Sequence, residues 1–141
     1  MVESGFAVQS LDHLVLTVTD LEATMDFYTR HLGMRPEKFF PADGTTRHAL
    51  IFGAQKINLH VAGSEYEPKA VAPAPGSADL CFLTDLPVGD WLTYLQANGL
   101  KVEEGPVRRT GAQGPILSIY LRDPDGNLIE LSNVIGSPES H

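Results

Sequence analysis

The chain has 141 residues, 43% of them hydrophobic and 20% charged, which is typical of one compact domain or of two small halves that share a core. The formal charge of −8 and the absence of any basic run longer than Arg108-Arg109 exclude a typical nucleic-acid-binding protein. No segment is apolar enough for a membrane span, and the first residues do not resemble a signal peptide. The single cysteine, Cys81, excludes an internal disulfide, so we expect a cytoplasmic protein in which Cys81 is a small buried residue.

The first half of the chain predicts one strand, one helix and three further strands. Alternating apolar residues predict a strand over 11–18. Asp20 is a favourable N-cap for the helix that follows, and Gly33 is suited to end it. Strand patterns then occur at about 35–40, 46–52 and 55–61.

The second half repeats this order. A strand is predicted over 78–84, Asp85 is the candidate N-cap of the next helix, and Gly99 is suited to end that helix. Strands at about 101–108, 115–122 and 127–133 complete the half. The intervening residues are rich in proline, glycine and alanine, which favours a linker.

The order β-α-β-β-β therefore occurs twice, at 8–62 and 77–135, and 63–76 connects the two copies. Neither half alone buries a sheet face, so we expect the two modules to pair. The predicted fold is α+β, with two paired βαβββ modules that form a curved mixed sheet around a central pocket.

A tight turn followed by a carboxylate on an apolar strand is the most informative motif. Asp123-Pro124-Asp125-Gly126 has strong turn-forming chemistry, and Glu130 follows within an otherwise apolar run. A carboxylate in apolar surroundings is costly unless a partner neutralises it. His13 lies on an equally apolar strand, and histidine and glutamate are both common ligands of divalent metals.

These features resemble the vicinal oxygen chelate superfamily over about residues 8–135. That superfamily includes glyoxalase I, fosfomycin-resistance proteins, extradiol dioxygenases and bleomycin-resistance proteins. The resemblance is carried by the double β-α-β-β-β order and by Asp12-His13, Phe27-Tyr28 before Leu32-Gly33-Met34, and Asp123-Pro124-Asp125-Gly126 with Ile129-Glu130-Leu131. Closer similarity to its glyoxalase domain-containing members is found in Lys56–His60, Pro73–Ser77 and Glu104–Ala112.

The resemblance implies one divalent metal ion, held by the first and last strands of each half. His13 and Glu130 fit two of the four ligand positions directly. Asn58 occupies the position of a glutamate in glyoxalase I, and His60, on the same strand face, is expected as a ligand or a substrate contact. Asp79 replaces a histidine and is expected as an acid–base residue or a ligand, the alternative being a solvated strand start. The set His13, His60 and Glu130 suits iron, manganese, nickel, cobalt or zinc.

Several further residues are expected to contact the substrate. Asn58, Ser118 and Tyr120 are candidate pocket residues, and Arg109 lies in a glycine-rich segment that is either a hairpin or a flap closing over an anionic substrate. The resemblance implies a metal-dependent enzyme that chelates adjacent oxygens of a small substrate, as a glyoxalase-like lyase or isomerase or as a ring-cleaving dioxygenase. The alternative is a small-molecule-sequestering protein of the bleomycin-resistance type. A homodimer is expected by the same analogy.

Overall fold

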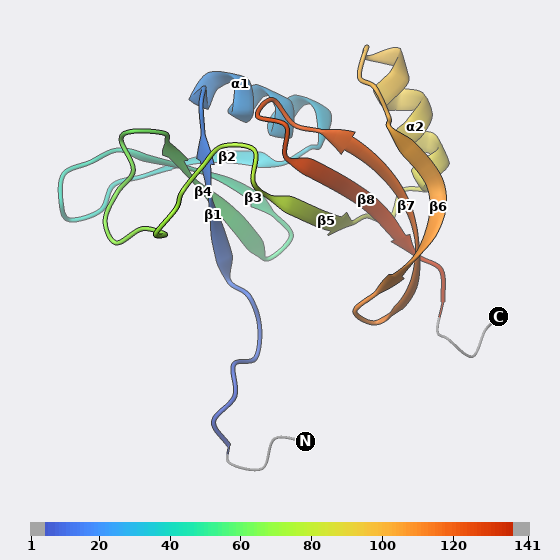
Figure 1. The fold of residues 1–141 in the computed structure, drawn as a ribbon, viewed down its shortest axis with the longest axis horizontal. Coiled ribbons are helices and arrows are strands. Elements are labelled where there is room, and N and C mark those ends of the chain that lie inside the picture. The colour runs from blue at the N-terminus through green and yellow to red at the C-terminus, as the bar shows by residue number, and fades with distance from the viewer. Residues whose placement is uncertain (1–4, 137–141) are drawn as a thin grey trace. The chain divides into compact units, whose positions relative to one another are not determined.

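The computed structural model of the chain describes residues 5–136. These residues divide into two compact modules, and the boundary lies between Val71 and Ala72. In Figure 1 the N-terminal module runs from blue to green and the C-terminal module from green to red. Each module contains one helical segment and one four-stranded sheet, in the order β-α-β-β-β. The predicted α+β class and the twofold repeat are therefore confirmed. No helix among residues 5–136 is both long and apolar enough to cross a membrane.

The N-terminal module forms a mixed sheet with the strand order β1-β4-β3-β2, in which β1 and β4 run parallel and the other pairs antiparallel. The helix α1 continues directly into a single π-helical segment, η1. The elements are β1 (His13–Val18), α1 (Leu21–Asp26), η1 (Phe27–His31), β2 (Arg35–Phe39), β3 (Arg47–Phe52) and β4 (Gln55–Val61).

Both predicted ends of the first helical segment are confirmed. The Asp20 side chain accepts a hydrogen bond from the Ala23 amide at 3.0 Å, which satisfies one of the unpaired amides at the helix start. At the other end Gly33 has a φ of 73°, and the Met34 amide donates to the Tyr28 carbonyl at 3.0 Å. This is the backbone arrangement that favours glycine after a helix.

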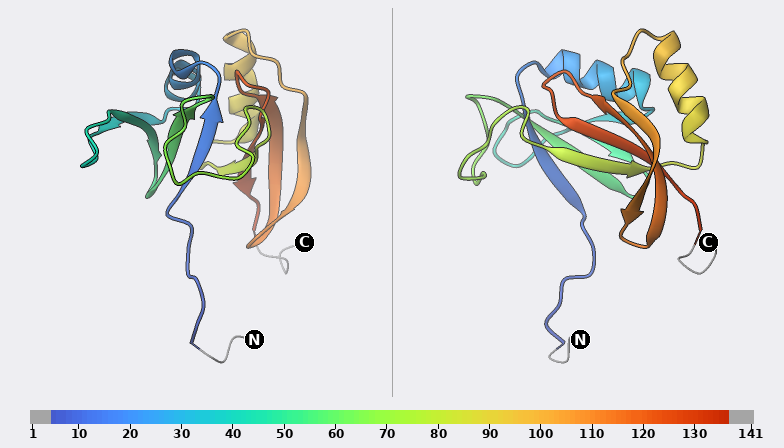
Figure 2. Two further views of the ribbon diagram at one scale, coloured as in Figure 1. Left: turned by 60° about the vertical axis from the view of Figure 1, so that its left-hand side comes forward. Right: turned by 45° about the vertical axis from the view of Figure 1, so that its right-hand side comes forward.

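The C-terminal module repeats the same topology, with the strand order β5-β8-β7-β6. Helix α2 packs against β7 and β8 on one face of the sheet, as the views in Figure 2 show. The buried side chains of Ile119 and Leu131 share one face of the sheet. Ser118, Glu130 and Ser132 alternate onto the other face. The elements are β5 (Asp79–Leu83), α2 (Val88–Ala97), β6 (Glu104–Gly111), β7 (Gly114–Arg122) and β8 (Leu128–Val134).

The start of α2 differs from the prediction. The helix begins at Val88 after Pro87, so Asp85 is not its N-cap. Instead Asn133 of β8 accepts a hydrogen bond from the Val88 amide at 2.8 Å, and its amide nitrogen donates to the carbonyls of Thr84 and Leu86 at 2.9 and 2.7 Å. A side chain distant in sequence thus replaces the local cap, which a pattern of neighbouring residues does not reveal.

The glycine-rich segment 105–114 is predicted from the sequence to be either a hairpin or a flap, and in the structure it forms a hairpin. Most of it belongs to β6, which pairs with β7 up to the pair Gly111 and Gly114, so only Ala112 and Gln113 form the connection. A register irregularity separates Glu104 from Val107 near the start of β6. The hairpin holds Arg109 on a paired strand and not on a long loop.

Candidate functional site

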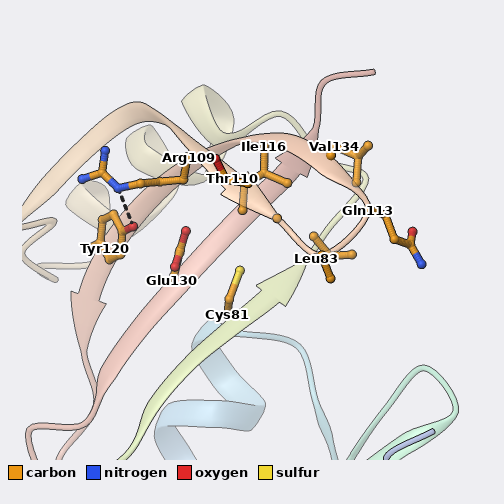
Figure 3. A pocket seen from close by; sticks show the side chains of 12 residues that line it. Cys81, Leu83, Arg109, Thr110, Gln113, Ile116, Tyr120, Glu130 and Val134 are labelled. Atoms are coloured by element: carbon orange, nitrogen blue, oxygen red, sulfur yellow. Dashed lines mark hydrogen bonds between the residues drawn. The ribbon is translucent and has the colours of Figure 1, made fainter. Parts of the chain in front are cut away.

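The C-terminal module contains a cavity of about 470 Å³, within the size range of small-molecule sites. Its walls come from all four strands and from the β6–β7 turn (Figure 3). Apolar and small side chains form most of the wall, and Glu130, Tyr120, Arg109 and Cys81 are its ionisable members. The lining residues are Cys81, Leu83, Arg109, Thr110, Gly111, Ala112, Gln113, Gly114, Ile116, Tyr120, Glu130 and Val134.

Glu130 is held in this wall by two buried serines. Strand register places Ser118 opposite Ser132 on β7 and β8, and both are fully buried. Ser118 Oγ donates to Glu130 Oε2 at 2.6 Å, Ser132 Oγ lies 2.7 Å from Ser118 Oγ, and Ser132 also reaches Oε2 at 3.4 Å. These hydrogen bonds stabilise the carboxylate, which explains how an apolar strand accommodates it. Ser118, which is predicted to contact the substrate, contacts Glu130.

Cys81 is exposed in the cavity wall, so the prediction of a buried structural cysteine is wrong. The reason is the strand period of two: on β5 the residues flanking Cys81, Leu80 and Phe82, are less exposed than Cys81, which points to the cavity side. Its Sγ lies 3.2 Å from Ser132 Oγ. Partial burial raises the pKa of the Cys81 thiol, so it is protonated near neutral pH.

Arg109 and Tyr120 form a second polar group in the same wall. Arg109 Nε donates to the Tyr120 hydroxyl at 3.0 Å, the dashed contact in Figure 3, and its Nη2 atom contacts Glu104 Oε2 at 2.9 Å. Arg109 also donates to the Arg108 carbonyl at 3.1 Å. Burial raises the pKa of the Tyr120 phenol. The arginine predicted to hold an anionic substrate is therefore already paired with a carboxylate of its own strand.

Asp79 lies at the exposed start of β5, opposite Leu128 of β8. With Tyr120, Glu130 and Leu128 it lines a second, more open cavity of about 400 Å³. This position is compatible with either predicted role of Asp79, as an acid–base group or as a solvated strand start.

In the N-terminal module His13 is the first residue of β1 and is exposed. Its Nδ1 lies 2.8 Å from Asp12 Oδ2, which orients the imidazole and leaves Nε2 as the nitrogen away from that contact. A histidine that binds metal usually has its second nitrogen paired in this way.

His60 has a different environment on β4. It is buried, and its ring packs edge-on against Tyr66 with 5.3 Å between the centroids. Arg47 lies over the same Tyr66 ring at 4.0 Å. Burial, with a smaller contribution from the positive charge of Arg47, lowers the pKa of His60, which favours the neutral imidazole.

The register of β1 and β4 separates the two histidines. His13 is paired with Lys56, whereas His60 is paired with Thr17, four positions further along the strands. At about 3.3 Å per residue this is about 13 Å along the sheet. Asn58 lies between them on β4, and its Oδ1 is buried without a hydrogen-bond partner among the described residues.

The pairing of β1 with β4 can be compared with the pairing of β5 with β8. The comparison shows that the predicted ligands occupy equivalent positions in the two modules. Asn58 is the residue of β4 paired with the third residue of β1, and Glu130 is the residue of β8 paired with the third residue of β5. His13 and Asp79 are likewise the first residues of β1 and β5. In residues 5–136 no group of three or more His, Cys, Asp and Glu side chains is close enough to hold a metal ion.

Sequence reasoning missed Cys81, Leu83, Ile116 and Val134 as cavity residues. Leu83 and Val134 are large apolar side chains that are more than half exposed, which a sequence does not show. Strand alternation is the signal that could have identified three of these cavity residues. Cys81 and Leu83 share a face of β5 with Asp79, and Val134 shares a face of β8 with Glu130.

The two βαβββ modules, and the cavity beside a strand-borne glutamate, define a protein of the glyoxalase type. The model of the Glyoxalase/Bleomycin resistance protein/Dioxygenase superfamily matches residues 10–131, and the chain belongs to this superfamily. The chain is 59% identical over 127 residues to the glyoxalase domain-containing protein RDO1 of Mycosarcoma maydis, a match that covers 90% of the chain and 69% of that protein.

Two further relatives cover nearly the whole chain. The virulence protein STM3117 of Salmonella typhimurium is 53% identical over 128 residues, which are 91% of this chain and 86% of that protein. The solved structure of VPC_CASS1, from the mobile metagenome of V. Pseudocholerae, has a TM-score of 0.87 at 53% identity and covers 93% of this chain and 98% of its own. A lactoylglutathione lyase from Agrobacterium tumefaciens, at 24% identity and a TM-score of 0.65, shares the fold.

Proposed function

We propose that the protein is a metal-dependent enzyme that binds a small molecule in the cavity beside Glu130 and acts on adjacent oxygens of that molecule. The observation that carries the proposal is the environment of Glu130. Its carboxylate is fixed by Ser118 at 2.6 Å and lines a cavity of about 470 Å³. An apolar cavity with a few polar groups directed into it is typical of a small-molecule site.

The chemistry of the predicted donors fits a divalent metal ion. His13 has its Nδ1 oriented by Asp12, His60 is biased to the neutral form that coordinates metals, and Asn58 Oδ1 is a buried oxygen without a partner in the described chain. Oxygen and imidazole donors of this kind suit iron, manganese, cobalt, nickel or zinc. His13 and Glu130 are the ligands that we propose first. His60 and Asn58 compete for the same role, since only one of them is needed beside His13.

A bound divalent metal would supply Lewis-acid stabilisation of negative charge on the substrate oxygens. The residues of the chain would position the substrate and transfer protons to or from it. The apolar side chains Leu83, Ile116 and Val134 would exclude water from the substrate body. Tyr120 and Asp79 lie in the cavities that share Glu130, where each could carry a proton to or from the substrate.

Metal content is the test of this proposal. Untagged protein purified without chelators should contain close to one equivalent of iron, manganese, nickel, cobalt or zinc per chain by plasma mass spectrometry. His13→Ala and Glu130→Gln should each lose that metal and keep the circular dichroism spectrum of the wild type. Unchanged stoichiometry in both variants would overturn the ligand assignment.

The second candidate is a sequestering protein without catalysis. It is favoured by the apolar wall of the cavity and by the absence of a three-ligand cluster within residues 5–136. A wild-type protein that neither contains metal nor takes it up on titration would support this candidate. The homodimer is proposed by family analogy alone, and light scattering at several concentrations would test it.

A further inference from the structure

The carboxylate of Glu130 receives a hydrogen bond from Tyr120 as well as from Ser118. Tyr120 is the residue of β7 directly opposite Glu130, so both side chains lie on the same face of the sheet. In Figure 3 the Tyr120 hydroxyl lies on the side of the ring that faces Arg109 and Glu130. An ionised carboxylate has no proton to give, so the phenol is the donor in this contact.

Arg109 sets the direction of that phenol proton. Its Nε–H donates to the Tyr120 hydroxyl oxygen at 3.0 Å, and a guanidinium has no atom that accepts a hydrogen bond. The single proton of the hydroxyl therefore points away from Arg109 and is left for Glu130. Because a hydrogen bond from a charged donor polarises the hydroxyl that accepts it, Arg109 also strengthens the contact from Tyr120 to the carboxylate.

The guanidinium is itself held in place on β6. Its Nη2 atom donates to Glu104 Oε2 at 2.9 Å, and its Nη1 atom donates to the Arg108 carbonyl at 3.1 Å. Glu104 is paired with Tyr120 across β6 and β7, so one planar guanidinium contacts both of them. A lysine ammonium is a compact charge on a flexible stem and does not reproduce this fork. The geometry of arginine, and not only its charge, therefore matters at position 109.

The internal repeat shows that the fold does not require this arrangement. Asn58 occupies on β4 the position of Glu130 on β8, and its neighbour on β3 is Ala49, whereas the neighbour of Glu130 on β7 is Tyr120. Alanine has no side-chain donor, and Asn58 Oδ1 has no hydrogen-bond partner among the described residues. The donor opposite the carboxylate is therefore particular to the C-terminal module.

We propose that Arg109 is a positioning residue that acts through Tyr120: it holds the phenol hydroxyl so that its proton fixes the Glu130 carboxylate for metal binding. This inference rests on the proposed function, in which Glu130 is a metal ligand. It differs from the role predicted from the sequence, contact with an anionic substrate, because it requires no contact between Arg109 and the substrate.

A double-mutant cycle on Mn²⁺ binding tests this coupling. Calorimetric titration of the EDTA-treated protein should show about tenfold weaker binding in Tyr120→Phe, as expected when a metal ligand loses an outer-shell partner. Arg109→Lys keeps the charge and loses the fork, so it should weaken binding about threefold or more alone, and less than about 1.5-fold when added to Tyr120→Phe. Equal losses in the two backgrounds, or no loss in either single variant, would overturn the proposal.

Arg122→Lys is the matched control. Arg122 lies on the same face of β7 as Tyr120, donates to Glu103 at 2.9 Å and to the Gly126 carbonyl at 3.2 Å, and lines the second cavity beside Glu130. The same substitution there should leave Mn²⁺ affinity unchanged. A loss equal to that of Arg109→Lys would mean that metal binding responds to any arginine on this face, and would contradict a role through Tyr120.

A measurement without metal separates this inference from the proposed function. In EDTA-treated protein at one fixed pH, the ¹³C signal of the Glu130 carboxyl carbon should shift in Tyr120→Phe and, in the same direction, in Arg109→Lys. These shifts in a protein that binds no metal would refute the metal-dependent function and keep the positioning of Glu130. One metal equivalent per chain, with the wild-type signal and affinity in both variants, would keep the function and refute the inference.

Discussion

The hydroxyl of Ser118 donates to the carboxylate of Glu130 across β7 and β8 at 2.6 Å, and Ser118 has no exposed surface. A short hydrogen bond from a buried donor to a charged acceptor is among the stronger kinds, and it fixes the direction of the carboxylate. Ser118 is therefore in a position to orient Glu130. Ser132 extends the contact, since its hydroxyl lies 2.7 Å from that of Ser118.

We expect Ser118→Ala to weaken binding at Glu130 about tenfold, because loss of an outer-shell partner typically costs 10- to 100-fold in affinity. Calorimetric titration of the EDTA-treated protein with Mn²⁺ would measure it. Ser118→Thr keeps the hydroxyl and should restore most of the affinity. If both variants bind as the wild type does, Ser118 is a core residue without a positioning role.

Local chemistry made much of the fold predictable. Asp123 shows why: its Oδ1 accepts from the amides of Asp125 and Asn127, both at 2.9 Å, so the turn before β8 is encoded within five residues. The N-cap at Asp20 is local in the same sense. The start of α2 is not, because its cap, Asn133, is 45 residues away.

The site was less predictable because it depends on register. Alternation along β8 places Glu130 on the polar face, but the pairing of Arg109 with Glu104 depends on the irregularity between Glu104 and Val107. Gly105-Pro106 is a sequence signal for an irregularity at this point, but it does not predict which side chains the shifted register brings together. The same holds for the four-position offset between His13 and His60, which follows from the pairing of β1 with β4.

The stability of the protein should depend on pH through His60. Burial lowers the pKa of His60 from its ordinary value of 6.5, so below that pH the unfolded chain binds the proton more readily than the folded one. This contribution to stability is complete above pH 6.5 and is lost as the pH falls from 6.5 toward the lowered value. Urea unfolding at pH 7.5 and 5.0 should show a smaller difference in His60→Phe, which keeps an aromatic ring against Tyr66, than in the wild type.

The control for this measurement is His48→Gln. His48 is paired with Leu59, so its side chain lies on the sheet face opposite to His60. We expect this variant to keep the pH dependence of the wild type. An undiminished pH dependence in His60→Phe would show that another group is responsible.

Asn133 should be a major determinant of the stability of the C-terminal module. Asn133→Ala removes the acceptor for the Val88 amide and both donors to the carbonyls of Thr84 and Leu86. Because partly buried backbone groups are left unpaired, we expect a loss of about 1–3 kcal/mol in the free energy of unfolding, measured by urea titration. Asp85→Ala, at the cap predicted from sequence, should change it by less than about 0.5 kcal/mol. Equal effects of the two variants would contradict the observed start of α2.

Gly105 should tolerate no side chain, because the backbone of β7 lies directly against it. Its φ is 110°, and an added Cβ would lie 2.8 Å from the Ile119 Cα and in contact with the Ser118 carbonyl oxygen. Gly105→Ala therefore combines a strained backbone with displacement of β7, and we expect a loss of more than about 2 kcal/mol in stability.

Gly105→Ala should also weaken binding in the cavity beside Glu130. Movement of β7 at Ser118 displaces Tyr120 and the hydroxyl that holds Glu130, so the folded fraction of Gly105→Ala should bind Mn²⁺ more weakly than the wild type. Gly44→Ala is the matched control, since Gly44 also has a positive φ, 81°, but an added Cβ would have nothing within 4 Å. We expect a cost of about 1 kcal/mol there and unchanged binding. Equal loss of stability in both variants would mean that backbone conformation alone, and not the contact with β7, requires glycine at position 105.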